Sequence, residues 1–146
     1  MTPRLDFFKA SPSALKALIA LESAVAKLGL DPLLLDLVKL RASQINGCAY
    51  CVDVHTVDAC AKGESERRLY AISVWRETPF FTPRERAALA WTEALTMIST
   101  THAPDGDYDA LVANFSEVER VDLTLAIGTI NVWNRLAIAF RKMPQE

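Results

Sequence analysis

The chain has 146 residues, of which 51% are apolar and 23% charged, with 5 Gly and 7 Pro. This length suits one domain with a substantial hydrophobic core, and the scarcity of turn residues disfavours a many-stranded sandwich. The net charge is −2, the pI is about 5.7, and no block of Lys or Arg occurs. Such a charge balance offers no electrostatic footprint for nucleic acid or an anionic membrane. We therefore expect a single domain over residues 1–146, with neither partner.

Cellular compartment and cysteine usage give a second set of limits. The N-terminus lacks the long apolar segment of a secretory signal, and no uninterrupted apolar run reaches the ~20 residues needed to cross a bilayer. The expected compartment is the cytoplasm. Three cysteines, two of them at Cys-x-x-Cys spacing, favour redox or metal chemistry over a disulfide framework in such a chain.

Start and stop signals divide the chain into helices. Proline stands at the first helical position after Ser11, Asp31 and Thr82, and Asn-Gly or Gly marks several ends. The sequence predicts helices over 12–28, 32–46, 48–62, 64–77, 83–100, 107–114 and 116–141, the fifth and the last opening with capping boxes. No strand pattern persists, so the expected fold is all-α with six to seven helices.

Two of these helices are unusually apolar. Residues 87–91 in the fifth and 121–140 in the last leave little polar surface, and a helix that is apolar all round must be buried. Two such helices are hard to cover within one small monomer, so we expect a large apolar interface between subunits. The alternative is a tightly packed central helix.

The chemistry of the chain centres on Cys48-Ala49-Tyr50-Cys51-Val52-Asp53-Val54-His55. In a helix, positions 48, 51 and 55 share one face. The preceding Asn-Gly break places the thiols at a helix N-terminus, which together with a nearby proton acceptor promotes the thiolate. Cys51 has His55 four residues on, and Cys48 is placed to close a disulfide with Cys51 after oxidation.

These residues also allow interpretations without redox chemistry. Both cysteines could be small buried hydrophobes, with His55 as a satisfied core residue. Zinc binding by Cys48, Cys51 and His55 is a more specific alternative. A structural zinc site needs four ligands, and the fourth would have to be Asp36, Cys60 or His102, none at a recognised spacing. We therefore expect no metal.

Two further residues need their own interpretation. Cys60 lies about 180° round the helix from Cys51, and we expect it to be a small core residue. Glu93 lies in an apolar helix, and a buried acid needs a partner or a raised pKa. It either supports the thiol site, lies on an exposed flank of its helix, or forms a salt bridge within a subunit interface.

The segments from Val38 to Thr56, 87–95 and 130–135 resemble the AhpD-like alkylhydroperoxidases of the carboxymuconolactone decarboxylase superfamily. The Cys-x-x-Cys-x-x-x-His core with its Ser-Gln-Ile-Asn-Gly lead carries most of the resemblance. It implies an all-α fold that assembles into homo-oligomers, often hexamers built as trimers of dimers and otherwise dimers or trimers, with no metal or organic cofactor. The decarboxylase branch lacks the cysteine pair, which disfavours lactone chemistry here.

The resemblance also implies a role for each site residue. Cys51 would be the peroxidatic thiol that reduces an organic hydroperoxide, Cys48 would resolve the sulfenic acid to a disulfide, and a disulfide reductant would regenerate the dithiol. His55 would belong to the proton relay. The family commonly has Glu twelve residues before the first cysteine, where this chain has Asp36. Because Asp is one methylene shorter, we expect it to reach His55 or the thiols through water.

The leading hypothesis is therefore a thiol-dependent hydroperoxidase. A close alternative is a disulfide-exchange oxidoreductase for a protein partner. The non-enzymatic alternative is a redox-responsive or zinc-binding interaction module.

Overall fold

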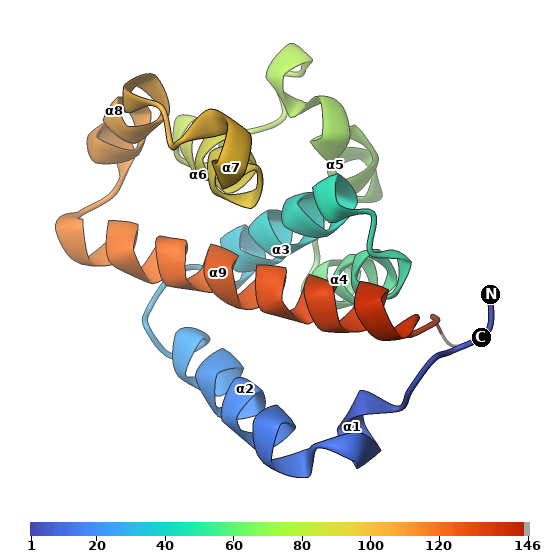
Figure 1. The fold of residues 1–146 in the computed structure, drawn as a ribbon. Coiled ribbons are helices and arrows are strands. Elements are labelled where there is room, and N and C mark those ends of the chain that lie inside the picture. The colour runs from blue at the N-terminus through green and yellow to red at the C-terminus, as the bar shows by residue number, and fades with distance from the viewer. Residues whose placement is uncertain (145–146) are drawn as a thin grey trace.

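The computed structural model describes residues 1–144, and this part of the chain contains helices and no strand, which confirms the all-α prediction (Figure 1). The last two residues of the predicted domain, 145–146, lie outside the described part. The elements are α1 (Phe7–Ala10), α2 (Pro12–Val25), α3 (Pro32–Asn46), α4 (Ala49–Ala61), α5 (Glu66–Ala71), the 3₁₀ helix η1 (Ile72–Glu77), α6 (Pro83–Thr96), α7 (Ile98–Thr101), α8 (Asp105–Asn114) and α9 (Glu117–Phe140).

Ten helical segments replace the expected six to seven because three short ones were not foreseen within residues 1–144. Helix α1 precedes the first predicted helix, the segment 64–77 divides into α5 and η1, and α7 separates from α6 at Met97. Each of these pieces has four to six residues. Helices this short depend on tertiary packing for their stability, and sequence periodicity does not detect them.

The strong cap signals are confirmed at the atomic level. Gly47 ends α3 in the left-handed region at φ 71°, a conformation in which any β-carbon would be strained. Thr82 and Ser116 both form the reciprocal capping boxes. The predicted helix 107–114 begins two residues earlier, at Asp105, and its N-cap position is Pro104. The sequence signals therefore locate the helix before the thiols correctly.

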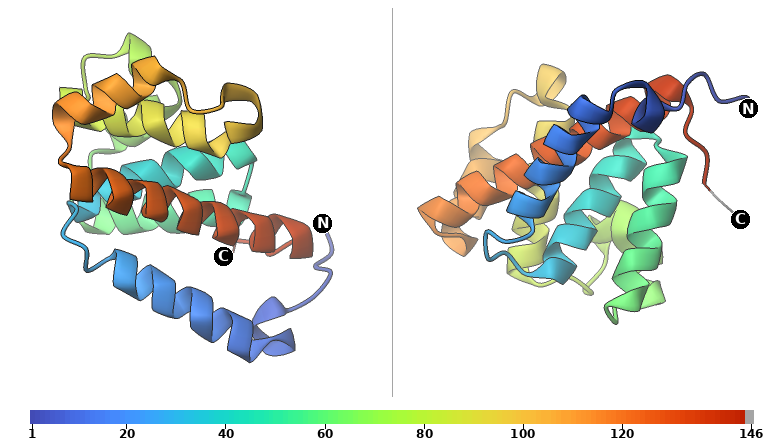
Figure 2. Two further views of the ribbon diagram at one scale, coloured as in Figure 1. Left: turned by 60° about the vertical axis from the view of Figure 1, so that its left-hand side comes forward. Right: turned by 90° about the horizontal axis from the view of Figure 1, so that it is seen from below.

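Helix α3 lies at the centre of the molecule and packs against α4, α6 and α9 (Figure 1). Helix α9 crosses the fold from one side to the other, and α2 packs along it (Figure 2). One hydrophobic cluster joins α3, α6, α8 and α9, and a second joins α3, α4, η1 and α6. Every residue of α3 from Leu34 to Leu40 is buried, including the charged Asp36 and Lys39.

The two apolar helices differ in how they are covered. The central part of α6, residues 87–94, is buried within the chain, as expected. In contrast, α9 leaves an exposed row of large apolar side chains: Val118, Val121, Leu125, Val132 and Ile138. The alternative of a tightly packed central helix is therefore wrong for α9 within one chain, and the predicted subunit interface stays a prediction.

Within residues 1–144, α9 is also the one helix long and apolar enough to cross a membrane by length and composition. It carries the buried Asn131 and Asn134 and packs on five other helices, α2, α3, α4, α6 and α8. This pattern is typical of a core helix in a globular domain.

Candidate functional site: a disulfide at the floor of a cavity

The thiol pair lies where the Asn-Gly break predicts. Cys48 is the N-cap of α4, and its Sγ accepts a hydrogen bond of 3.3 Å from the backbone N–H of Cys51. The two residues form a disulfide with their Cα atoms 5.3 Å apart, and both are almost fully buried. The positive end of α4 therefore faces both sulfurs, which favours the thiolate form of a reduced pair.

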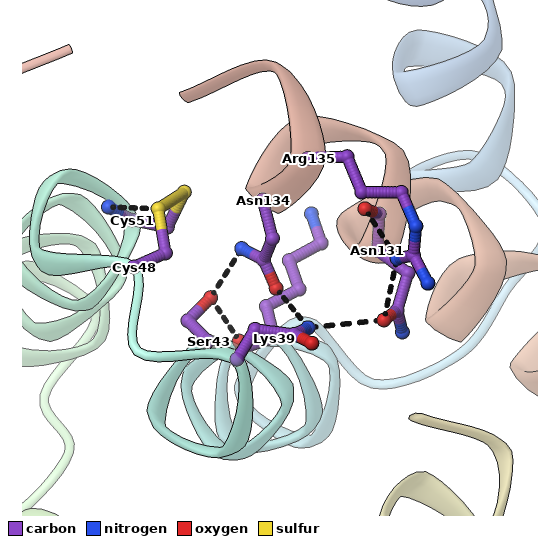
Figure 3. The surroundings of a disulfide bond; sticks show 8 residues. Lys39, Ser43, Cys48, Cys51, Asn131, Asn134 and Arg135 are labelled. Carbon is purple, nitrogen blue, oxygen red and sulfur yellow. Dashed lines mark hydrogen bonds between the residues drawn. A yellow bond between two sulfur atoms is a disulfide. The ribbon is translucent and has the colours of Figure 1, made fainter. Parts of the chain in front are cut away.

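A polar network fixes the loop that leads into Cys48. Asn46, the last residue of α3, donates hydrogen bonds to the side-chain oxygens of Asn131 (3.0 Å) and Asn134 (2.8 Å). Asn134 in turn donates to Ser43 Oγ at 3.0 Å, and Figure 3 shows this network beside the disulfide. Every buried amide in the network has a partner, so the network holds the end of α3 against α9.

A cavity of about 290 Å³ opens beside the disulfide between α1, α2, α3, α4 and α9. It is lined by Phe7, Phe8, Glu22, Asp36, Lys39, Tyr50, Cys51, Val54, His55, Asp58, Lys62, Trp133 and Ala137. Three of the four predicted site residues, Cys51, His55 and Asp36, thus share one cavity. Cys48 does not line it, so the cavity reaches one sulfur of the pair and not the other.

His55 lies one helical turn beyond Cys51 on the same face of α4. Its Nδ1 is buried and has no hydrogen-bond partner among the described residues. Burial, reinforced by the positive charge of Lys39, lowers the pKa of His55 to about 4. The imidazole is therefore neutral at pH 7 and available to accept a proton.

Asp36 does not contact His55 directly. Its Oδ2 accepts a hydrogen bond of 2.6 Å from Nζ of Lys62, which sequence analysis did not single out. Burial raises the pKa of Asp36, against the opposing effect of the Lys62 ammonium. The carboxylate expected in the relay is thus present in the cavity but is paired with a lysine at the far end of α4.

A second ion pair lines the cavity and was also missed. Glu22 of α2 pairs with the buried Lys39 of α3, and its other oxygen accepts a hydrogen bond of 3.3 Å from Nε1 of Trp133. The signal in the sequence was Lys39 itself, since a charge within a continuous apolar run requires a partner. That partner lies 17 residues away on another helix, so spacing alone could not identify it.

Two residues weighed from sequence lie elsewhere. Cys60 is exposed, so its predicted place in the core is wrong; α4 turns that face to solvent because its opposite face carries the cavity. Glu93 accepts hydrogen bonds from Arg41 (2.8 Å), Trp75 Nε1 (2.9 Å) and Arg76. The arginine and tryptophan donors hold the pKa of this carboxyl below its usual range despite its burial. Its burial excludes the exposed flank, its salt bridges lie within one chain, and it does not line the cavity.

The zinc alternative lacks a ligand set in this structure. Among residues 1–144, no three His, Cys, Asp or Glu side chains are grouped so that they could hold a metal ion. Of the three candidate fourth ligands, Asp36 binds Lys62 and Cys60 faces away from the cysteine pair.

Comparisons with solved structures find close matches to this fold. Protein ATU0492 of Agrobacterium tumefaciens, a protein of unknown function suggested to be the antioxidant defence protein AhpD, is 48% identical with a TM-score of 0.97 over 99% of both chains. The debrominase Bmp8 shares the fold at a TM-score of 0.86 and 21% identity, over 94% of this chain and 74% of that one.

Comparisons of the sequence also find related proteins and a matching family. The uncharacterized protein YdfG of Bacillus subtilis is 37% identical over 95% of both chains. The uncharacterized protein YnjA of Escherichia coli is 33% identical over 70% of this chain and 56% of its own length. Residues 12–94 match the carboxymuconolactone decarboxylase family, and this segment contains α2 to α4 and the cysteine pair. The chain therefore belongs to the carboxymuconolactone decarboxylase family, with an AhpD-like fold.

Proposed function

We propose that this protein is a thiol-dependent peroxidase that reduces organic hydroperoxides through the Cys48–Cys51 pair. The observation that carries the proposal is the access of the cavity to Cys51 and not to Cys48, with a neutral histidine one turn away. A peroxide that enters the cavity would meet the sulfur of Cys51, the imidazole of His55 as a base, and the aromatic rings of Phe8 and Trp133. The match to a suggested AhpD protein supports the same class of reaction.

The reaction follows from these positions. His55 takes the thiol proton of Cys51, and the thiolate attacks the terminal peroxide oxygen, so that an S–O bond forms and the O–O bond breaks. The protonated imidazole then gives its proton to the departing alkoxide, which leaves as an alcohol. The sulfenic acid on Cys51 reacts with the thiol of Cys48, which releases water and forms the disulfide. A dithiol reductant returns the pair to its starting state.

Asp36 and Lys62 would serve this cycle from the far end of the cavity. Lys62 is about half exposed while Asp36 is buried, so the pair links the interior to bulk water. His55 could exchange protons with solvent through water along this side of α4, since both Asp58 and Lys62 line the cavity beyond it. The shorter carboxylate at position 36 would therefore act through an ion pair and not by direct contact with His55.

The test is a single turnover of reduced protein with one equivalent of an organic hydroperoxide, followed by thiol titration and mass spectrometry of the disulfide. Two thiols should disappear per peroxide, with Cys48 and Cys51 joined. Cys51→Ser should abolish the reaction, and Cys48→Ser should stop it at the sulfenic acid. Cys60→Ser, on the exposed face, is the matched control and should react at the full rate. Full activity in Cys51→Ser would refute the assignment.

The disulfide-exchange alternative uses the same pair with a protein partner. It would give a stable mixed disulfide when reduced Cys48→Ser is mixed with an oxidised partner protein, and peroxide turnover would then be slow in the wild type. The two activities are separated by measuring both on one preparation.

The proposed assembly is a homo-oligomer, a hexamer or a smaller ring or dimer, located in the cytoplasm. Four exposed apolar side chains of α9 support this, because Val118, Val121, Leu125 and Val132 lie on one face of the helix at 3.6 residues per turn. Light scattering after size exclusion gives the subunit number, and Val121→Glu should reduce it if this face forms the interface.

A further inference from the structure

The cavity is divided by polarity along α4. Apolar side chains surround Cys51 at the N-terminal end of the helix, whereas Asp58 and Lys62 lie beyond His55. Tyr50 and Lys62 are separated by about 18 Å along the helix at 1.5 Å per residue. A ligand that reacts at Cys51 must therefore place its body in the apolar end.

The charged end has no unpaired cation to hold an anionic ligand. Lys39 pairs with Glu22, and Lys62 pairs with Asp36. These are the cations that line the cavity among the described residues. Because an ammonium already neutralised by a carboxylate gains little from a second one, neither of these two lysines favours an anionic ligand.

The apolar end is an aromatic wall. The Phe8 ring stacks on Phe7 at 4.8 Å and on Trp133 at 6.3 Å between ring centroids. The indole N–H of Trp133 is tied to Glu22, so the wall has a fixed orientation. On the opposite side, the ammonium of Lys142 lies over both Phe8 (5.5 Å) and Tyr50 (5.6 Å). The ring faces available to a ligand therefore belong to residues held in place by their neighbours.

The volume limits the size of the ligand. The cavity measures about 290 Å³, at the lower end of the range of about 300–1,000 Å³ typical of small-molecule sites. It therefore suits a compact ligand better than a long-chain lipid hydroperoxide.

We propose that the substrate is a compact aromatic hydroperoxide whose ring lies on the Phe8–Trp133 wall with its peroxide group at Cys51. This inference rests on the proposed function for the reaction, which consumes the peroxide and releases the corresponding aryl-substituted alcohol by the steps given above. The binding of the ring is a separate property of the cavity. It can be measured on the oxidised protein, where no turnover occurs.

The test compares two product alcohols of equal size. 2-Phenylpropan-2-ol and nonan-1-ol each have about ten non-hydrogen atoms, but one carries an aromatic ring and the other is linear. We expect the aromatic alcohol to bind the oxidised protein about 2- to 10-fold more tightly, as for one aromatic contact, measured by NMR titration. Equal or tighter binding of nonan-1-ol would overturn the proposal.

Variants assign the preference to the wall. Phe8 is 37% exposed, so Phe8→Leu leaves the core intact and should remove most of the preference for the aromatic alcohol. Tyr70→Leu replaces an aromatic residue that is 74% exposed outside the cavity and should leave the preference unchanged. If Phe8→Leu and Trp133→Leu both retain the wild-type preference, the wall is not the binding surface.

Reaction rates distinguish this inference from the function on which it rests. Reduced protein should react about 2- to 10-fold faster with cumene hydroperoxide than with a linear hydroperoxide of the same size. Phe8→Leu should lose that ratio, whereas Tyr70→Leu, outside the cavity, should keep both the ratio and the rate. Equal rates with both peroxides would refute the inference and leave the peroxidase proposal standing. Aromatic binding without any peroxide reaction would refute the proposed function and leave the aromatic site standing.

Discussion

The lowered pKa of His55 predicts a specific acid sensitivity of the fold. In the unfolded chain a histidine titrates near 6.5, whereas in the folded protein burial and Lys39 lower the pKa to about 4. Between these values the unfolded state binds a proton that the native state does not, so the free energy of unfolding falls as the pH falls. The loss of unfolding free energy is therefore complete below pH 4 and close to zero at pH 7.

The magnitude follows from the shift of about 2.5 units. It corresponds to a loss of about 2 kcal/mol by pH 5 and about 3 kcal/mol by pH 4, a large fraction of the stability of a domain this size. His55→Gln and His55→Leu each remove the titrating group, so both variants should lose less stability than the wild type over the same range.

The assay is urea unfolding of the oxidised proteins at pH 7, 5 and 4, followed by circular dichroism. The carboxylates contribute equally to all three proteins, so the difference between wild type and variant isolates His55. If the wild type and both variants lose the same free energy between pH 7 and 4, then His55 is not desolvated in the way the structure shows.

Three further predictions concern residues outside the cavity or at its edge. Glu93→Gln weakens the charged pairs with Arg41 and Arg76 and should cost about 2 to 3 kcal/mol in urea unfolding; an unchanged turnover per folded molecule would confirm a structural role, and a loss of turnover would contradict it. Asn134→Ala removes two hydrogen bonds of the buried network and should cost about 2 kcal/mol, so an unchanged unfolding midpoint would argue against that network. Cys60 is exposed and outside the disulfide, so the oxidised native protein should titrate with one thiol per chain and Cys60→Ser with none; reaction only after denaturation would mean that the thiol is covered.

The sequence predicted most of what depends on local signals. Asn46-Gly47 ended α3 and placed Cys48 at the start of α4, because a left-handed residue at that point requires Gly. The capping boxes at Thr82 and Ser116 were equally local. From these signals the disulfide pair and the common face of Cys51 and His55 followed correctly.

The rest of the site is built from contacts that no local pattern encodes. The partner of Asp36 proved to be Lys62, 26 residues along the chain, and Glu22 reaches Lys39 across two helices. The aromatic wall begins with Phe8, in a four-residue helix too short to show a period. Cys60 was misplaced because a helix position opposite the thiols was assumed to face the core, while α4 is packed from one side.

The place of Cys48 at the N-cap of α4 also decides how experiments on the resolving thiol should be designed. Serine is among the preferred N-cap residues, whereas alanine at such a position costs about 1 kcal/mol. Cys48→Ser therefore removes the crosslink and preserves a hydrogen-bond acceptor for the N–H of Cys51. Cys48→Ala removes both, and its lower stability would be misread as the contribution of the disulfide. The difference in unfolding free energy between these two variants measures the cap alone.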